Sequence, residues 1–171
     1  DEIKKLFPVL PSNIFVISPE SRISTYIVMN KCNSVIIYGT KMGVELTSVG
    51  IPVIVAGEAW IRNKGVTYDV SSKEQYFELL SNLPFDHKLD KTVTSRARKY
   101  AFHYFFRRMI PIDCIEPSKI KSPYKFALSS IKNIENGKDK GLDIICEGIT
   151  EGLDFIYPYE DFVDKNNKET L

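Results

Sequence analysis

The sequence predicts an α/β fold in which a parallel, Rossmann-like sheet is covered by helices on both faces. Two observations predict this class: strand-like runs that are apolar on both faces, and helices of about ten residues between them. The chain has 171 residues, of which 43% are apolar and 26% charged, enough to build a core. We therefore expect one ordinary domain and exclude a disordered chain.

The first two thirds of the chain alternate between strand-like and helix-like segments. The β-branched and aromatic runs predict strands over residues 13–18, 34–39, 52–57 and, at the edge of the sheet, 66–70. Apolar spacing predicts helices over residues 22–30 and 40–49, with Gly50 where a helix ends. Only three or four strands are identifiable, so the sheet is expected to be incomplete.

Two further helices are expected before residue 110. Ser71 and Ser72 precede Glu74 and Gln75 as in a capping box, which predicts a helix that ends just before Pro84. Residues 90–109 form a longer helical pattern with apolar residues on one side and basic residues on the other. This mixture of basic and aromatic residues is typical of a surface that binds nucleic acid or a membrane. It is equally typical of a helix that packs on the core with its apolar side and exposes its basic side to solvent. Arg98 lies toward the apolar side, where it serves a buried pair or a site, or extends its charged end to solvent.

The last third predicts a smaller helical extension packed on the core. Residues 111–123 contain three prolines and no clear period, and residues 124–152 contain two helix-like pieces separated by Asn136 and Gly137. Residues 164–171 form a polar tail. We therefore divide the chain into a Rossmann-like core, residues 1–110, and an extension, residues 111–171.

Charge and cysteine content exclude several classes of protein. The net charge is +1, which gives no global attraction to nucleic acid or to an anionic membrane. The longest apolar runs are far shorter than the roughly 20 residues of a transmembrane helix. Three widely spaced cysteines, Cys32, Cys114 and Cys146, favour reduced buried thiols over a disulfide framework or a zinc site. These features are typical of a cytoplasmic protein.

Ligands of open parallel sheets bind at the carboxyl ends of the strands, and three strand-to-helix junctions lie at such positions. The first is residues 18–21, which begins with Ser18. In the second, Gly39 allows a turn, Thr40 supplies a hydroxyl and Gly43 leaves space for another group. Glu45 either binds two sugar hydroxyls there or is simply a first-turn carboxylate that the helix dipole favours.

The third junction, residues 57–65, is a loop with two cations and a terminal glycine. Arg62 and Lys64 can neutralise a pyrophosphate leaving group without a metal, or they are incidental charges on a solvated loop. Trp60 either covers a base or sugar or anchors the loop in the core. The chain lacks both a Walker loop and G-x-G-x-x-G, so neither an ATPase nor a nicotinamide enzyme has direct support.

Taken in order, these junctions resemble the C-terminal, nucleotide-binding half of the two-Rossmann-domain (GT-B) glycosyltransferases, particularly bacterial capsule and surface polysaccharide biosynthesis proteins. The resemblance covers roughly residues 13–83. The segments that carry it are 35–45 (VIIYGTKMGVE), 50–57 (GIPVIVAG), 63–67 (NKGVT) and 74–76 (EQY).

The resemblance implies roles for several of the candidate site residues. It implies that Glu45 holds the donor ribose, that Thr40 and the backbone amides of residues 41–43 hold phosphate, and that Arg62 and Lys64 lie near the pyrophosphate. The complete set of candidate binding residues is Ser18, Gly39, Thr40, Lys41, Gly43, Glu45, Arg62, Lys64 and Gly65. It implies no cofactor and no metal, because the nucleotide-diphosphate or nucleotide-monophosphate sugar is itself the donor substrate.

The resemblance also implies what the chain lacks. The general base of such enzymes normally comes from an N-terminal domain, and no candidate for it is present, so we expect a fragment of a longer chain without turnover of its own. The expected partners are the donor and a polysaccharide or lipid-linked acceptor that the missing domain binds. Nucleic acid is not expected, and the setting is the cytoplasm or a peripheral complex on the inner face of the cell membrane.

Three other functions remain open for these residues. Two are enzymatic, a nucleotide-sugar epimerase or a polyol-phosphate transferase of similar architecture. The third is a non-catalytic α/β interaction module of a biosynthetic complex, in which the three junctions are structural.

Overall fold

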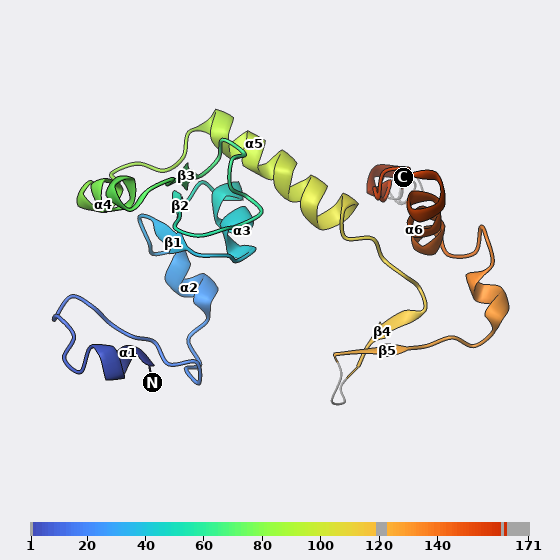
Figure 1. Ribbon diagram of the computed structural model, residues 1–171, viewed down its shortest axis with the longest axis horizontal. Coiled ribbons are helices and arrows are strands. Elements are labelled where there is room, and N and C mark those ends of the chain that lie inside the picture. The colour runs from blue at the N-terminus through green and yellow to red at the C-terminus, as the bar shows by residue number, and fades with distance from the viewer. Residues whose placement is uncertain (1, 119–122, 162, 164–171) are drawn as a thin grey trace, which may run out of the picture. The chain divides into compact units, whose positions relative to one another are not determined.

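The computed structural model describes residues 2–118, 123–161 and 163, and its fold is mixed α/β (Figure 1). The chain forms two compact units, Asp1–Cys32 and Asn33–Leu171. Within the described part of the chain, no helix is long and apolar enough to cross a membrane. The division at residue 110 stays a prediction.

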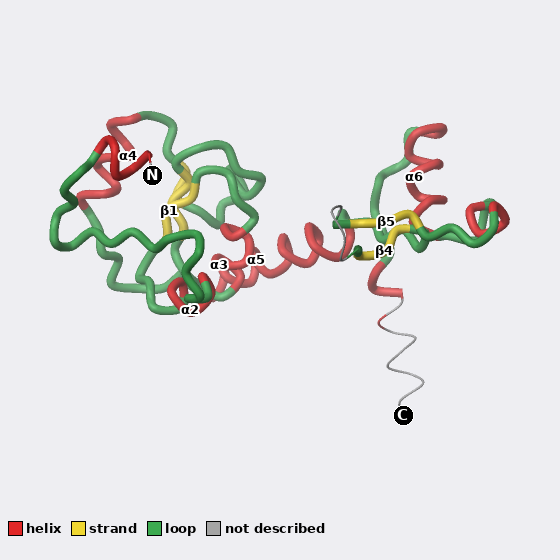
Figure 2. The backbone as a smooth tube through the Cα atoms, turned by 90° about the horizontal axis from the view of Figure 1, so that it is seen from below, coloured by secondary structure: helices red, strands yellow, loops and turns green. Residues whose placement is uncertain are grey.

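The first unit contains two short helices, α1 (Glu2–Leu6) and α2 (Thr25–Met29), joined by a long loop that is drawn green in Figure 2. The strand expected over residues 13–18 is wrong, because this segment has no regular structure and the side chain of Phe15 is 85% exposed. A β-branched run becomes a strand only beside another strand that accepts its hydrogen bonds. No described strand pairs with this segment.

The second unit contains a three-stranded parallel sheet. Its strands β1 (Val35–Ile37), β2 (Val53–Val55) and β3 (Tyr68–Asp69) lie in the order β1-β2-β3, so β3 is an edge strand as expected. The register pairs Ile37 with Val55, and Val55 with Asp69. The three strands expected over residues 34–70 are thus confirmed, and with them the α/β class and its parallel sheet.

The core of this unit lies around β2. All three residues of this strand are fully buried, as its continuous apolar run predicts. Helix α3 (Met42–Ser48) follows β1 and contributes buried Val44 and Leu46. The chain leaves α3 through Gly50, whose positive φ of 86° is a conformation that glycine adopts without strain.

The capping box before α4 (Lys73–Ser81) is confirmed in a modified form. The Ser72 hydroxyl accepts a hydrogen bond from the Gln75 backbone N–H at 3.2 Å. The Gln75 side chain accepts from the backbone N–H of Ser71 at 2.9 Å, one residue before the N-cap. These two bonds satisfy donors that a helix start leaves open.

The long basic and aromatic helix consists of α5 (Lys91–Phe102) and a π-helical turn, η1 (His103–Arg107). Helix α5 packs along α3 (Figure 1). Arg98 donates from Nε to the carbonyl oxygen of Ser48 at 2.9 Å, so it pairs with backbone and not with a buried carboxylate. Arg96, from the side expected to be solvated, donates to the carbonyl oxygen of Gly65 at 3.2 Å.

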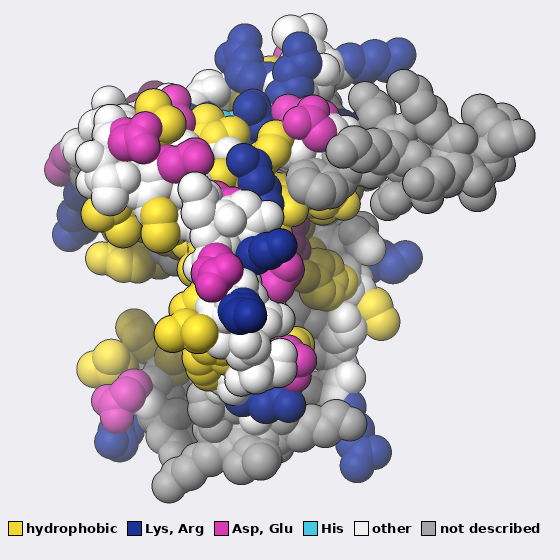
Figure 3. All heavy atoms as spheres, turned by 90° about the vertical axis from the view of Figure 1, so that its right-hand side faces the viewer, with side chains coloured by type: hydrophobic (Ala, Val, Ile, Leu, Met, Phe, Trp, Pro, Cys, Tyr) yellow, Lys and Arg dark blue, Asp and Glu magenta, His cyan; other side chains and the backbone are white. Residues whose placement is uncertain are grey.

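The remainder of the unit contains an antiparallel hairpin that the sequence did not predict, β4 (Ile115–Pro117) and β5 (Tyr124–Phe126). The two expected helical pieces are a 3₁₀ turn, η2 (Ile131–Ile134), and helix α6 (Lys140–Glu151). Figure 3, in which the right-hand side of Figure 1 faces the viewer, shows exposed apolar side chains among charged ones. The polar tail, residues 164–171, lies outside the described residues.

Candidate functional site

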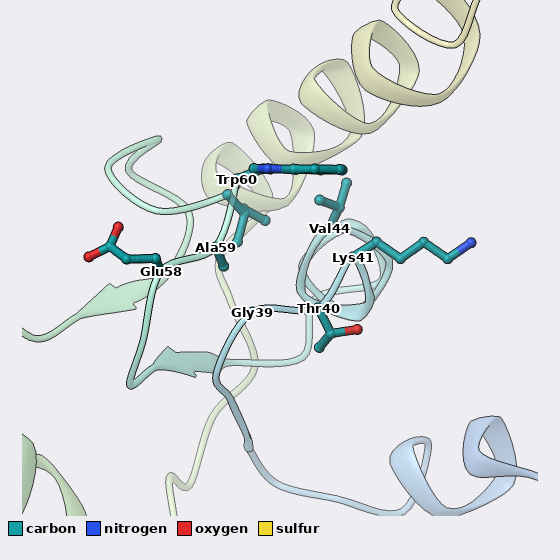
Figure 4. Close-up of a pocket in the computed structure, with 8 residues that line it drawn as sticks. Gly39, Thr40, Lys41, Val44, Glu58, Ala59 and Trp60 are labelled. Carbon is teal, nitrogen blue, oxygen red and sulfur yellow. The ribbon is translucent and has the colours of Figure 1, made fainter.

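A cavity of about 330 Å³ lies at the carboxyl ends of β1 and β2 (Figure 4). Because Ile37 and Val55 are paired in register, the loops that follow the two strands emerge side by side. The cavity is lined by the second and third junctions together: Gly39, Thr40, Lys41, Val44, Glu58, Ala59, Trp60 and Ile61. Its volume lies at the lower end of the range of small-molecule sites.

Gly39 allows the two loops to approach each other closely. A Cβ atom at this position would lie 2.9 Å from the carbonyl oxygen of Glu58, closer than side-chain carbons approach backbone oxygens. Any larger residue would force the loops apart and change the cavity. The structure thus shows a steric reason why position 39, in the predicted site, is a glycine.

Thr40 and Lys41 form the polar edge of the cavity, just before α3. The Thr40 hydroxyl oxygen accepts a hydrogen bond from the backbone N–H of Met42 at 3.3 Å, and the hydroxyl hydrogen keeps its capacity to donate. Both residues are exposed. In Figure 4, the ammonium of Lys41 and the carboxylate of Glu58 point in opposite directions.

Trp60 is an exposed aromatic wall of the cavity. Its side chain is 70% exposed, so it does not anchor the loop in the core, and its neighbour Ile61 is buried instead. The indole lies 5.2 Å from the ring of Tyr104, centroid to centroid, at an angle of 49°. Figure 4 shows it at the end of the cavity near Val44, away from Gly39 and Thr40.

Helix α5 also fixes the backbone of Trp60. The Tyr100 hydroxyl donates a hydrogen bond to the carbonyl oxygen of Trp60 at 2.7 Å. Burial raises the pKa of Tyr100, and the charge of a neighbouring Tyr104 phenolate would raise it further, so the hydroxyl is a donor over the physiological pH range. Helix α5 thus holds the backbone of Trp60, while the indole contacts Tyr104 of η1.

Arg62 holds the loop that follows β2 by hydrogen bonds to backbone carbonyls. Its guanidinium donates to the carbonyl oxygens of Val55, at 3.3 Å, and Gly57, at 3.0 Å, and also to that of Val70. These acceptors lie at the ends of β2 and just beyond β3, so one side chain joins the two strand ends. A contact of Arg62 with pyrophosphate stays a prediction.

Two predicted residues near the cavity do not line it. Gly43 is a buried residue of α3, at which a Cβ atom would lie 2.6 Å from Cδ1 of Ile37 and 3.2 Å from Cγ2 of Ile61. The space left by the missing side chain of Gly43 is therefore occupied by core side chains and not by a ligand. Glu45 follows Val44 on α3 and is half-buried.

Three other predicted residues are not among those that line the cavity. Lys64 is exposed, and Gly65 has a positive φ of 66° that gives the loop its turn. Ser18 belongs to the first unit, where its hydroxyl donates to the carboxylate of Glu20 and holds the pKa of that carboxyl below its usual range. The structure therefore brings Gly39, Thr40 and Lys41 together with Trp60, and not all nine candidates.

The second and third junctions contain Glu58, Ala59, Val44 and Ile61, but sequence reasoning did not single out these four as binding residues. The signal for Glu58 and Ala59 was their position directly after a buried strand, the same signal that identified Gly39 and Thr40. Among the described residues, no three His, Cys, Asp or Glu side chains gather as metal ligands do. Comparison of the chain with protein-family models, curated proteins and solved structures finds no match in any of the three.

Proposed function

We propose that this cavity binds the nucleotide of an activated sugar, and that the chain is the donor-binding domain of a glycosyltransferase of capsule or surface polysaccharide biosynthesis. One observation carries the proposal: the loops after two adjacent parallel strands, 17 or more residues apart in sequence, share one cavity with an exposed tryptophan as its wall. The sheet is then part of a Rossmann-like domain. In this proposal, a second domain binds the acceptor and supplies the catalytic base.

The lining residues suit the chemistry of such a ligand. An exposed indole offers a flat apolar face for a nucleobase or for a pyranose ring. Lys41 and the Thr40 hydroxyl supply a cation and a donor for phosphate oxygens. In this proposal the nucleobase or the pyranose ring lies against Trp60, and the diphosphate lies toward Lys41.

Glu45 is the proposed ribose ligand. It lies four residues after Lys41, and side chains at this spacing share one face of a helix. A nucleotide whose phosphates contact Lys41 can therefore reach Glu45 with its ribose hydroxyls. Lys41 and Lys64 would stabilise the diphosphate leaving group without a metal, in a cytoplasmic enzyme or one bound peripherally to the inner face of the membrane.

Calorimetric titration of the chain with nucleoside diphosphates and monophosphates tests this proposal. We expect saturable binding of at least one nucleotide. Glu45→Ala should weaken the affinity for that nucleotide by roughly tenfold or more, because charge-assisted hydrogen bonds to the ribose are lost. Glu151→Ala, an exposed carboxylate on α6, is the matched control and should leave binding unchanged.

The titration also separates the proposal from its alternatives. A folded chain that binds none of these nucleotides would contradict the donor site and favour a non-catalytic interaction module. Product analysis with a longer chain that includes the acceptor domain would distinguish sugar transfer from epimerisation and from polyol-phosphate transfer.

A further inference from the structure

Helix α5 and its π-helical continuation η1 carry a local excess of positive charge. Residues 91–112 contain six Lys or Arg and no Asp or Glu, in a chain whose net charge is only +1. The remainder of the chain is therefore net negative. Such a concentration on one element is an electrostatic feature of that surface, and the overall balance conceals it.

The side of this helix that faces away from the core is both cationic and apolar, so the expected separation of apolar and basic residues onto opposite sides is wrong. Ala97 is buried on the packed side. Helical spacing brings Lys91, Lys99, Phe102 and Phe106 to the opposite side. The side chains of Phe102, Phe106 and Met109 are 37%, 43% and 48% exposed. We refer to Lys91, Lys99, Phe102 and Phe106, together with Met109 two residues beyond η1, as the α5–η1 face.

Arginines flank the α5–η1 face and keep their charge. Arg98 donates to the carbonyl oxygen of Ser48, and Arg108 donates to His103 Nε2 at 3.3 Å. Neither partner is a carboxylate, so neither neutralises the guanidinium. Of the arginines in this stretch, Arg107 forms an ion pair, with Glu160 at 3.2 Å.

The aromatic rings of this face are better suited to a membrane than to nucleic acid. Phe102 stacks on Phe106 with their centroids 5.5 Å apart, and Phe106 packs against Tyr159 at 4.8 Å. Bases stack on free ring faces, which these contacts partly occupy. Insertion between lipid headgroups requires only exposed apolar area beside Lys and Arg side chains.

We propose that the α5–η1 face binds the surface of a membrane that contains anionic lipids. The cations are attracted to the negative headgroups, and Phe102, Phe106 and Met109 enter the boundary between headgroups and acyl chains. This face shares no residue with the cavity. The proposal therefore stands or fails independently of nucleotide binding.

Sedimentation of the chain with lipid vesicles tests this inference. Vesicles of phosphatidylcholine with phosphatidylglycerol should bind the chain at least tenfold more tightly than phosphatidylcholine alone, and added salt should weaken the binding. The double variant Lys91→Glu with Lys99→Glu should lose at least tenfold in affinity. Lys132→Glu with Lys138→Glu changes the net charge equally at exposed positions elsewhere and should retain binding.

Met109→Ser supplies the apolar arm of the test and should also weaken binding to the anionic vesicles. Circular dichroism of each variant confirms that the helices are intact. Equal binding to both kinds of vesicle, no binding to either, or full binding by the Lys91 and Lys99 variant would overturn the proposal. So would tighter binding to a single-stranded oligonucleotide at the same ionic strength, which would assign the face to nucleic acid.

Discussion

Replacing Arg62 with methionine is expected to lower the free energy of unfolding by about 2–4 kcal/mol. The guanidinium donates to three backbone carbonyls at the ends of two strands. Methionine fills a similar volume but cannot donate, so part-buried carbonyl oxygens would lose their partners. Urea unfolding followed by circular dichroism measures the change.

Lys64→Met is the matched control, because Lys64 lies exposed on the same loop. It should change stability by less than about 0.5 kcal/mol. The experiment also separates the two roles of Arg62. An Arg62→Met chain with unchanged stability and lost nucleotide binding would show that the guanidinium acts on the ligand and not on the strands.

Replacing Gly141 with alanine is expected to destabilise the chain by about 3 kcal/mol. A Cβ atom at Gly141 would lie 1.7 Å from the carbonyl oxygen of Pro111, so the start of α6 would have to move away from that segment. The sign of the effect is informative, because the same substitution in an unobstructed helix stabilises it by about 1 kcal/mol. Thermal unfolding measures the difference.

The neighbouring substitution Lys140→Ala controls for changes in helix propensity, since Lys140 is exposed in the same first turn of α6. It should leave the melting temperature nearly unchanged. A Gly141→Ala chain that melts at or above the temperature of the unmodified chain would refute the close packing of α6 on Pro111.

The elements around the core were predictable because their sequence pattern reports burial directly. Strand β2 is apolar at every position and lies at the centre of the sheet, and Gly50 ends α3 where expected. The run at residues 13–18 is also rich in β-branched and aromatic residues but pairs with none of the described strands, and hydrogen-bond partners are a property of the whole fold. The hairpin of β4 and β5 was missed because its exposed side chains leave no burial pattern.

The candidate site was predictable to the same extent. The positions of Gly39, Thr40 and Lys41 follow from one rule, that ligands meet parallel sheets at the carboxyl ends of strands. The acceptors of Arg62 include Val55 and Val70, which lie outside the 57–65 loop, and Trp60 is supported by Tyr100, 40 residues away in sequence. A motif within one loop cannot reveal them, which is why the alternatives for both residues stayed open.

The fluorescence of Trp60 tests the central claim most directly, because it is the sole tryptophan of the chain and forms a wall of the cavity. Titration with nucleoside diphosphates, with inorganic pyrophosphate as a ligand that lacks a base, should give a saturable change in emission for a nucleotide and a smaller one for pyrophosphate. The Glu45→Ala chain should need a higher nucleotide concentration to reach the same change. Emission that stays constant while a nucleotide binds by calorimetry would place the ligand elsewhere and contradict the assignment of this cavity.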